Sequence, residues 1–155
     1  METDGRQENA EILNTIRKAL VEGSESVRAL EMTLKRCATS LRVGEPGPVL
    51  GELTDAIANL ALVTELVGQL RKGLLASKME GTPFSRWQAS ASTEAFQGIV
   101  AALEGKDWVF LSDLLEYEIC PLMAETGREM SLLGDGMCAT GPEDLPATVT
   151  SRDPV

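Results

Sequence analysis

Histidine is absent from this 155-residue sequence, and aromatic residues make up only 4% of it. Helical bundles that hold di-iron or haem use inward-facing histidines, and histidine is also the usual base for a serine or cysteine nucleophile. The sequence therefore argues against such metal or haem sites and against nucleophilic catalysis. Because apolar residues still make up 43%, the core must consist of Leu, Val, Ile and Ala, which favours helices over a sheet.

Positive charge is also scarce, since 14 Lys and Arg residues face 24 Asp and Glu residues, giving a net charge of −10. This charge repels nucleic acid and anionic lipid. No apolar run approaches the length of a membrane span, and the N-terminus is polar, unlike a leader sequence. We expect an acidic protein with no nucleic-acid partner and no membrane partner.

The three cysteines, Cys37, Cys120 and Cys138, are odd in number and far apart. This pattern argues against a disulfide framework and is typical of a reducing compartment, so it predicts a cytoplasmic protein. No Gly-rich phosphate loop is present, because residues 44–48 contain no lysine and predict only a turn. We expect no cofactor.

Hydrophobic periodicity predicts four amphipathic helices, at about residues 7–42, 48–78, 83–104 and 107–133. Residues 1–6 are predicted to be a flexible N-terminus. Gly and Pro recur after residue 133 without periodicity, so residues 134–155 are predicted to form a disordered tail. Short connections between amphipathic helices imply one all-α domain, an antiparallel up-down-up-down four-helix bundle.

The first helix contains apolar positions at alternating spacings of three and four, which form a heptad seam: Leu13, Ile16, Leu20, Gly23, Val27, Leu30, Leu34, Cys37 and Leu41. A glycine inside a helix costs about 1 kcal/mol relative to alanine, so Gly23 could end the helix. However, the seam keeps its phase across Gly23, and a turn would usually reset it. We predict one long helix that is thin or bent at this point.

The second helix has a predicted seam of Leu53, Ile57, Leu60, Thr64, Val67, Arg71 and Leu74, and its apolar face is widened by Ala56, Val63, Leu66 and Leu70. The third helix is expected to begin at Pro83 with Thr82 as its N-cap. Gly105 is expected to cap its end, and Asp107 to cap the start of the fourth helix.

The fourth helix has the widest apolar surface. Six residues span about 140° on a helical wheel, where about 100° would suffice: Trp108, Leu111, Leu114, Leu115, Ile119 and Leu122. Phe110 and Tyr117 extend this arc to about 200°. Two interpretations follow. Either this helix is central or covered by the tail, or Phe110, Leu114 and Tyr117 form a surface for a partner.

Other candidate sites on the fourth helix also have two interpretations. Asp113, Glu116 and Glu118 could bind a hard cation, but a solvated acidic face is the more ordinary role for such residues. Cys120 falls on the outward side with Asp113 and Glu116, and acidic neighbours would raise its pKa. Cys37 occupies a core position of the first helix.

Pro121 lacks an N–H group, so it either frees the carbonyl of Tyr117 or merely bends the helix around the core. Glu118 lies within the apolar arc of the fourth helix, and Arg71 lies in the seam of the second. We predict a buried charge pair between them, because a buried carboxylate without a partner is costly. The alternative is that helix rotation turns one or both to water.

One segment, residues 102–122, contains Ala-Leu-Glu, then Asp-Trp-Val, then Asp-Leu-Leu-Glu-Tyr-Glu and Pro-Leu. It resembles a segment of a group of small bacterial helical proteins of unknown function. The resemblance covers about twenty residues; it implies a bacterial cytosolic helical bundle and assigns no catalytic residue.

Taken together, the wide apolar face and the missing catalytic groups predict a non-enzymatic protein–protein interaction module, of an adaptor, chaperone-like or regulatory type. Its partner would be another protein or a second copy of the chain. The alternative is a small-ligand-binding helical bundle with a pocket near Trp87, Phe96 and Trp108.

Overall fold

The computed structural model describes residues 2–44, 46–77, 83–88 and 90–139. Within these ranges the protein is helical and contains no strand, which confirms the predicted all-α class. The helices are α1 (Glu2–Arg42), α2 (Leu50–Ala76), α3 (Ser90–Gly105), α4 (Trp108–Leu114) and α5 (Cys120–Ala139). A π-helical segment, η3 (Leu115–Ile119), joins α4 to α5, and two 3₁₀ turns, η1 (Gly47–Val49) and η2 (Ser85–Gln88), precede α2 and α3.

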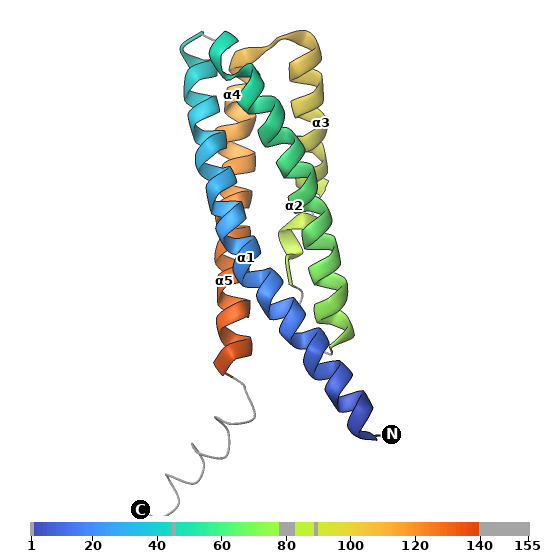
Figure 1. The fold of residues 1–155 in the computed structure, drawn as a ribbon. Helices are drawn as coiled ribbons and strands as arrows, with labels where there is room; N and C mark the ends of the chain where they lie inside the picture. The colour runs from blue at the N-terminus through green and yellow to red at the C-terminus, as the bar shows by residue number, and fades with distance from the viewer. Residues whose placement is uncertain (1, 45, 78–82, 89, 140–155) are drawn as a thin grey trace, which may run out of the picture.

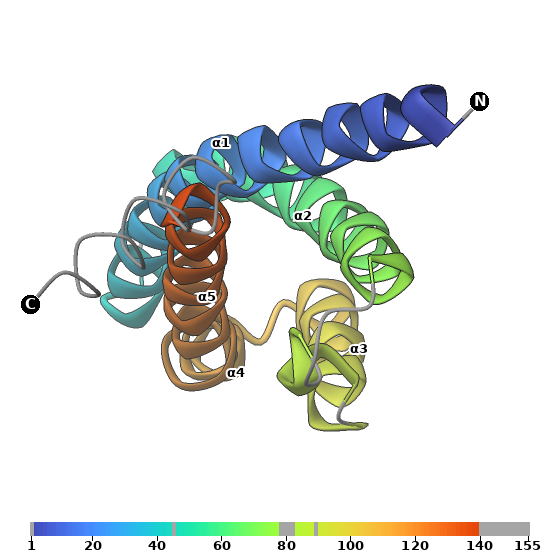
Figure 2. The same cartoon turned by 90° about the horizontal axis from the view of Figure 1, so that it is seen from below.

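Helix α1 lies against most of the other helices, packing on α5, α2 and α4 (Figures 1 and 2). Its predicted seam is buried from Ile16 to Leu41, and the helix continues without a break through Gly23. A Cβ atom at Gly23 would stand 3.1 Å from side-chain atoms of both Leu66 and Met130. Glycine at this point lets side chains of α2 and α5 approach the α1 backbone.

Both ends of the helical region extend further than predicted. Residues 2–6, predicted to be flexible, belong to α1, whose N-terminal end projects past the other helices (Figure 1). Leu13, a predicted seam residue, lies on this part and is 41% exposed. Residues 134–139, predicted to be disordered, belong to α5, and a Cβ at Gly134 would be 3.3 Å from Val21. Residues 140–155, the rest of the predicted tail, lie outside the described residues.

The buried side of α2 is rotated by one residue from the prediction. The buried residues are Leu53, Ala56, Leu60, Val63, Val67, Leu70 and Leu74. Of the predicted seam, Ile57 and Arg71 are only half-buried and Thr64 is exposed. Both candidate stripes are largely apolar, so periodicity alone did not distinguish them.

The start of the third helix also differs from the prediction. Pro83 and Phe84 form a turn, and Phe84 is fully buried with a left-handed backbone (φ 56°). The Phe84 N–H donates to the Glu129 carboxylate at 2.9 Å, and the Trp87 indole N–H donates to the Thr126 hydroxyl at 2.8 Å. These bonds to α5 override the local preference for a helix starting at Pro83, and the predicted cap, Thr82, lies outside the described residues.

Packing around α1 is uneven. The α4–η3–α5 side is close-packed, whereas within the described ranges α3 packs on α4 and η3 and makes few contacts with α2. Figure 2 shows α3 standing apart from α1, beyond α2. In the part of the chain that the structure describes, no helix combines the length and apolarity that crossing a membrane requires.

Candidate interaction site

The junction between α3 and α4 orients the α4 surface. Lys106 adopts a left-handed backbone (φ 54°), its N–H bonds to the Leu103 carbonyl, and the Asp107 N–H bonds to the Ala102 carbonyl. This pair of bonds is a Schellman motif, in which α3 ends at the predicted cap Gly105 and the left-handed residue is Lys106. The Asp107 side chain accepts from the Phe110 N–H at 3.2 Å, which confirms Asp107 as the N-cap.

The π-helical segment ends at Ile119, two residues before Pro121. The Cys120 N–H bonds to the Leu115 carbonyl, five residues back instead of four. Pro121 has no N–H, so it can serve neither the Tyr117 carbonyl in an α-helix nor the Glu116 carbonyl in a π-helix. The wider turn accommodates this missing donor and lets the chain continue as a helix into α5.

The π segment changes which residues of the fourth helix face the core. Ile119 and Cys120, although adjacent, are both buried, and Glu118 is exposed. The predicted outward position of Cys120 is therefore wrong, as is a buried charge pair between Arg71 and Glu118. A 100° wheel assumes α-helical turns throughout, and the wider π turn displaces Glu118 from the apolar arc.

Both described thiols lie in apolar surroundings. Cys37, as predicted, is buried, and Cys120 is 3% exposed with its Sγ atom 3.9 Å from the Glu31 carbonyl oxygen. Burial raises the pKa of the Cys120 thiol to about 11, and burial followed by the negative charge of Glu52 raises the pKa of Cys37. Neither thiol is therefore activated as a nucleophile near neutral pH.

The predicted partner residues Phe110 and Tyr117 are both exposed, at 45% and 61%, and Val109 beside them is 62% exposed. We call these three residues the aromatic surface. Leu114, the third predicted partner residue, is half-buried, because its Cδ1 atom would stand 2.9 Å from a Cβ at Gly98 of α3. Leu114 thus joins α4 to α3, while the aromatic surface faces solvent.

Arg42, at the end of α1, fixes one side of the aromatic surface. Its guanidinium lies 5.7 Å from the centre of the Tyr117 ring and forms ion pairs with Asp113 (2.8 Å) and Glu116 (2.6 Å). A side-chain hydrogen bond with Tyr117 raises the pKa of Arg42, and the two carboxylates add to the effect. Ser112, below them, accepts from Arg42 and donates to the Ala38 carbonyl at 2.8 Å.

The acidic residues of this region serve an ion-pair network. Two of the three carboxylates considered as cation ligands, Asp113 and Glu116, are bound to Arg42, and Glu118 is exposed. Within the described ranges, no group of three or more Cys, Asp or Glu residues is arranged to hold a metal ion.

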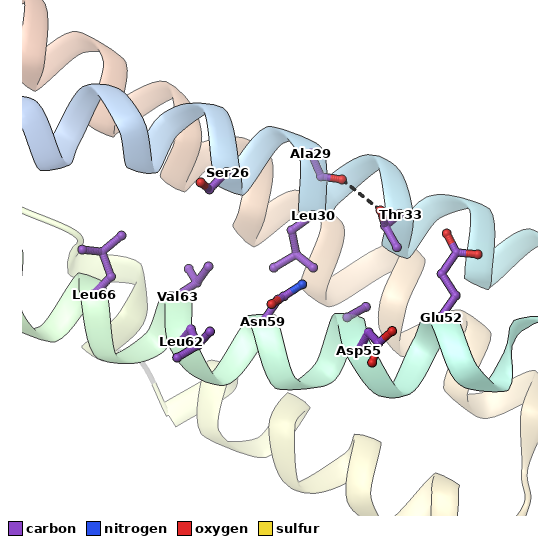
Figure 3. A pocket seen from close by; sticks show the side chains of 11 residues that line it. Ser26, Ala29, Leu30, Thr33, Glu52, Asp55, Asn59, Leu62, Val63 and Leu66 are labelled. Carbon is purple, nitrogen blue, oxygen red and sulfur yellow. Dashed lines mark hydrogen bonds between the residues drawn. The ribbon is translucent and has the colours of Figure 1, made fainter.

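A groove of about 590 Å³ runs between α1 and α2 (Figure 3). We call it the α1–α2 groove; its lining residues are Ser26, Ala29, Leu30, Thr33, Glu52, Asp55, Ala56, Asn59, Leu62, Val63 and Leu66. Periodicity alone does not reveal this groove, because the apolar character of α2 on more than one side also fits a widened core face.

A second hollow, of about 300 Å³, lies between α2 and α3 where these helices make few contacts. Its lining is almost wholly apolar: Ile57, Leu60, Ala61, Thr64, Phe96, Ile99 and Val100. We call it the α2–α3 pocket. Of the three aromatic residues predicted to surround a ligand, Phe96 lines it. Trp87 lies against Phe96, with ring centroids 5.9 Å apart, while Trp108 is not in its lining.

These features define an all-α helical domain whose candidate sites are exposed apolar side chains and grooves. The family model described as Domain of unknown function (DUF8042) matches residues 11–127, and the chain belongs to this family. The matched region includes the aromatic surface, the α1–α2 groove and the α2–α3 pocket. The comparisons found no matching curated protein and no matching solved structure.

Proposed function

We propose that this protein is a non-enzymatic protein–protein interaction module of an adaptor, chaperone-like or regulatory type. The observation that carries the proposal is the aromatic surface, where Phe110 and Tyr117 remain exposed although aromatic residues are scarce in the sequence. Aromatic side chains are enriched among the residues that dominate binding energy at interfaces. Arg42, paired with Asp113 and Glu116, lies over the Tyr117 ring at the border of this surface.

The proposal extends to the architecture and setting of the module. An antiparallel up-down-up-down order of the four-helix bundle is supported by the reversals of the chain after α1 and after α3 in Figure 1. A location in the bacterial cytoplasm is supported by the free thiols of Cys37 and Cys120. It is also supported by residues 102–122, which resemble a segment of small bacterial helical proteins. The net charge of −10 supports a protein partner over nucleic acid or an anionic membrane.

The test is capture of a partner from host extract on immobilised full-length protein. Phe110→Ala with Tyr117→Ala should reduce the captured partner by at least about tenfold, because aromatic residues are enriched among the interface residues whose truncation costs about 2 kcal/mol or more. A matched control carries Met32→Ala with Leu132→Ala, since both residues are 65% exposed and lie on other helices. Equal capture by the two double variants, or none by the wild type, would contradict the proposal.

A small-ligand-binding bundle is the second candidate, and the α2–α3 pocket is the observation that favours it. Its volume of about 300 Å³ is at the lower end for ligand sites, and its walls offer almost no polar group to orient a ligand. Dodecanoic acid tests this candidate. A rise in the unfolding temperature that Ala61→Trp abolishes would support ligand binding here, and no shift would exclude this ligand class.

A further inference from the structure

Helix α2 carries apolar side chains on sides that its neighbours leave open. Its buried face lies against α1, but Leu62 is 64% exposed and Leu66 is half-buried on the flank beyond it. Polar residues normally occupy the side of a helix opposite its buried stripe, so an exposed leucine such as Leu62 stands outside that pattern. Within the described ranges α2 packs mainly on α1, so part of its apolar surface is left to be covered by something else.

The α1–α2 groove could accommodate a helix of another protein. Leu30 and Val63 point into the space between the two helices and form its apolar floor (Figure 3). Ser26, Ala29 and Ala56, which also line the groove, are too small to fill the space above this floor. The groove extends along α2 from Glu52 to Leu66, which is about 20 Å at 1.5 Å per residue. Small residues on both walls would let the backbone of a docked helix approach closely.

The rim of the groove is acidic. Asp55 is exposed on the α2 side. On α1, the exposed residues Glu22 and Glu25 lie one turn before Ser26 and Ala29 and therefore on the same face. Arg36, one turn beyond Thr33 on α1, is engaged in an ion pair with Glu52 of the groove lining. A partner in this groove would meet carboxylates above an apolar floor.

We propose that the α1–α2 groove is a docking site for a basic amphipathic helix of a partner protein. Apolar side chains at i, i+3 or i+4, and i+7 of that helix would contact Leu30, Leu62 and Val63, and flanking Lys or Arg would face the acidic rim. A second copy of the chain fits less well, because it would bring its own charge of −10 to an acidic rim. This inference rests on the proposed function, since it assumes that the chain is an interaction module. It adds the α1–α2 groove as a second binding surface and names the chemistry of the helix that would bind there.

The experiment measures binding of a synthetic Leu/Lys amphipathic peptide to the full-length chain by fluorescence anisotropy. A peptide of about 14 residues spans about 20 Å as a helix. Leu62→Ser and Asp55→Lys should each weaken binding by at least about tenfold. The matched controls, Leu132→Ser (65% exposed, against 64% for Leu62) and Glu104→Lys (exposed, with the same charge change as Asp55→Lys), should change the Kd by less than about threefold.

Three results would overturn the docking site. They are no binding of the peptide, equal weakening by Asp55→Lys and Glu104→Lys, and a Leu62-dependent dimer of the peptide-free protein in light scattering. If Asp55→Lys and Glu104→Lys weaken peptide binding equally, the peptide is held by the overall negative charge and not by the groove. A Leu62-dependent dimer would mean that the groove binds a second copy of the chain. The two proposals can fail separately, because the capture experiment uses variants of the aromatic surface and the peptide experiment uses variants of the groove. If Phe110→Ala with Tyr117→Ala abolishes capture of a partner but the peptide does not bind, the proposed function is supported and only the docking site in the groove is rejected.

Discussion

The two flanks of α1 differ in how completely they are packed. Toward η3 and α5, the side chains of Leu115, Ile119, Met123 and Met130 have no exposed surface. Toward α2, the α1–α2 groove and, beyond it, the α2–α3 pocket leave Leu62 exposed and Ile57 half-buried. The closed flank buries its apolar side chains completely, whereas the open flank retains apolar surface that a binding partner can use.

Paired isoleucine substitutions test this difference most strongly. Ile119→Ala should lower the free energy of unfolding by about 2–5 kcal/mol, because the change leaves a cavity in a close-packed region. Ile57→Ala should cost about 1 kcal/mol or less, since this side chain already borders a hollow. Urea unfolding of both variants checks the comparison. If the two changes cost the same, α2 is packed as closely as η3 and the proposed contrast between the flanks is lost.

Paired glycine substitutions should give a smaller difference. Gly23→Val should destabilise the fold by about 1–3 kcal/mol through overpacking, because a Cβ there would already stand 3.1 Å from Leu66 and Met130. Gly68→Val on α2 should change stability by about 0.5 kcal/mol or less, because nothing lies within 4 Å of a Cβ at that position. Thermal unfolding followed by circular dichroism measures both. A neutral Gly23→Val would show that the side chains of Leu66 and Met130 can move away from the α1 backbone.

The pH dependence of stability should show the smallest effect, confined to alkaline solution. Burial raises the pKa of Cys120 from 9.0 to about 11, so between these values the unfolded chain loses the thiol proton and the folded chain keeps it. The stability that the buried, protonated Cys120 thiol contributes to the fold is fully present below pH 9 and is lost as the pH rises through about 11. Stability should therefore fall more between pH 9 and pH 11 in the wild type than in Cys120→Ala. If the free energy of unfolding changes with pH in the same way in both proteins, the Cys120 thiol is solvated in the folded state and its pKa is not raised by burial.

The candidate site was predicted in part. The aromatic surface was found from its position at the edge of a wide apolar arc, and Phe110 and Tyr117 are indeed exposed. The helical wheel places Leu114 on the same surface, but the contact of Leu114 with Gly98 is a tertiary feature that a helical wheel does not contain. The α1–α2 groove and the α2–α3 pocket exist because neighbouring helices do not pack closely along α2. Local hydrophobic periodicity carries no information about the packing of distant helices.

The sequence by itself determined the all-α class, the unbroken seam of α1 from Ile16 to Leu41 and the cap at Asp107, because heptad spacing and capping act within a few residues. Tertiary structure alone decided which side of α2 is buried, since the helix is apolar on several sides and the neighbouring helix selects one. It also decided the start of α3, where bonds from Phe84 and Trp87 to α5 replace a helical turn. The π segment before Pro121 belongs to the same group, because it brings both Ile119 and Cys120 into the core and turns Glu118 to solvent.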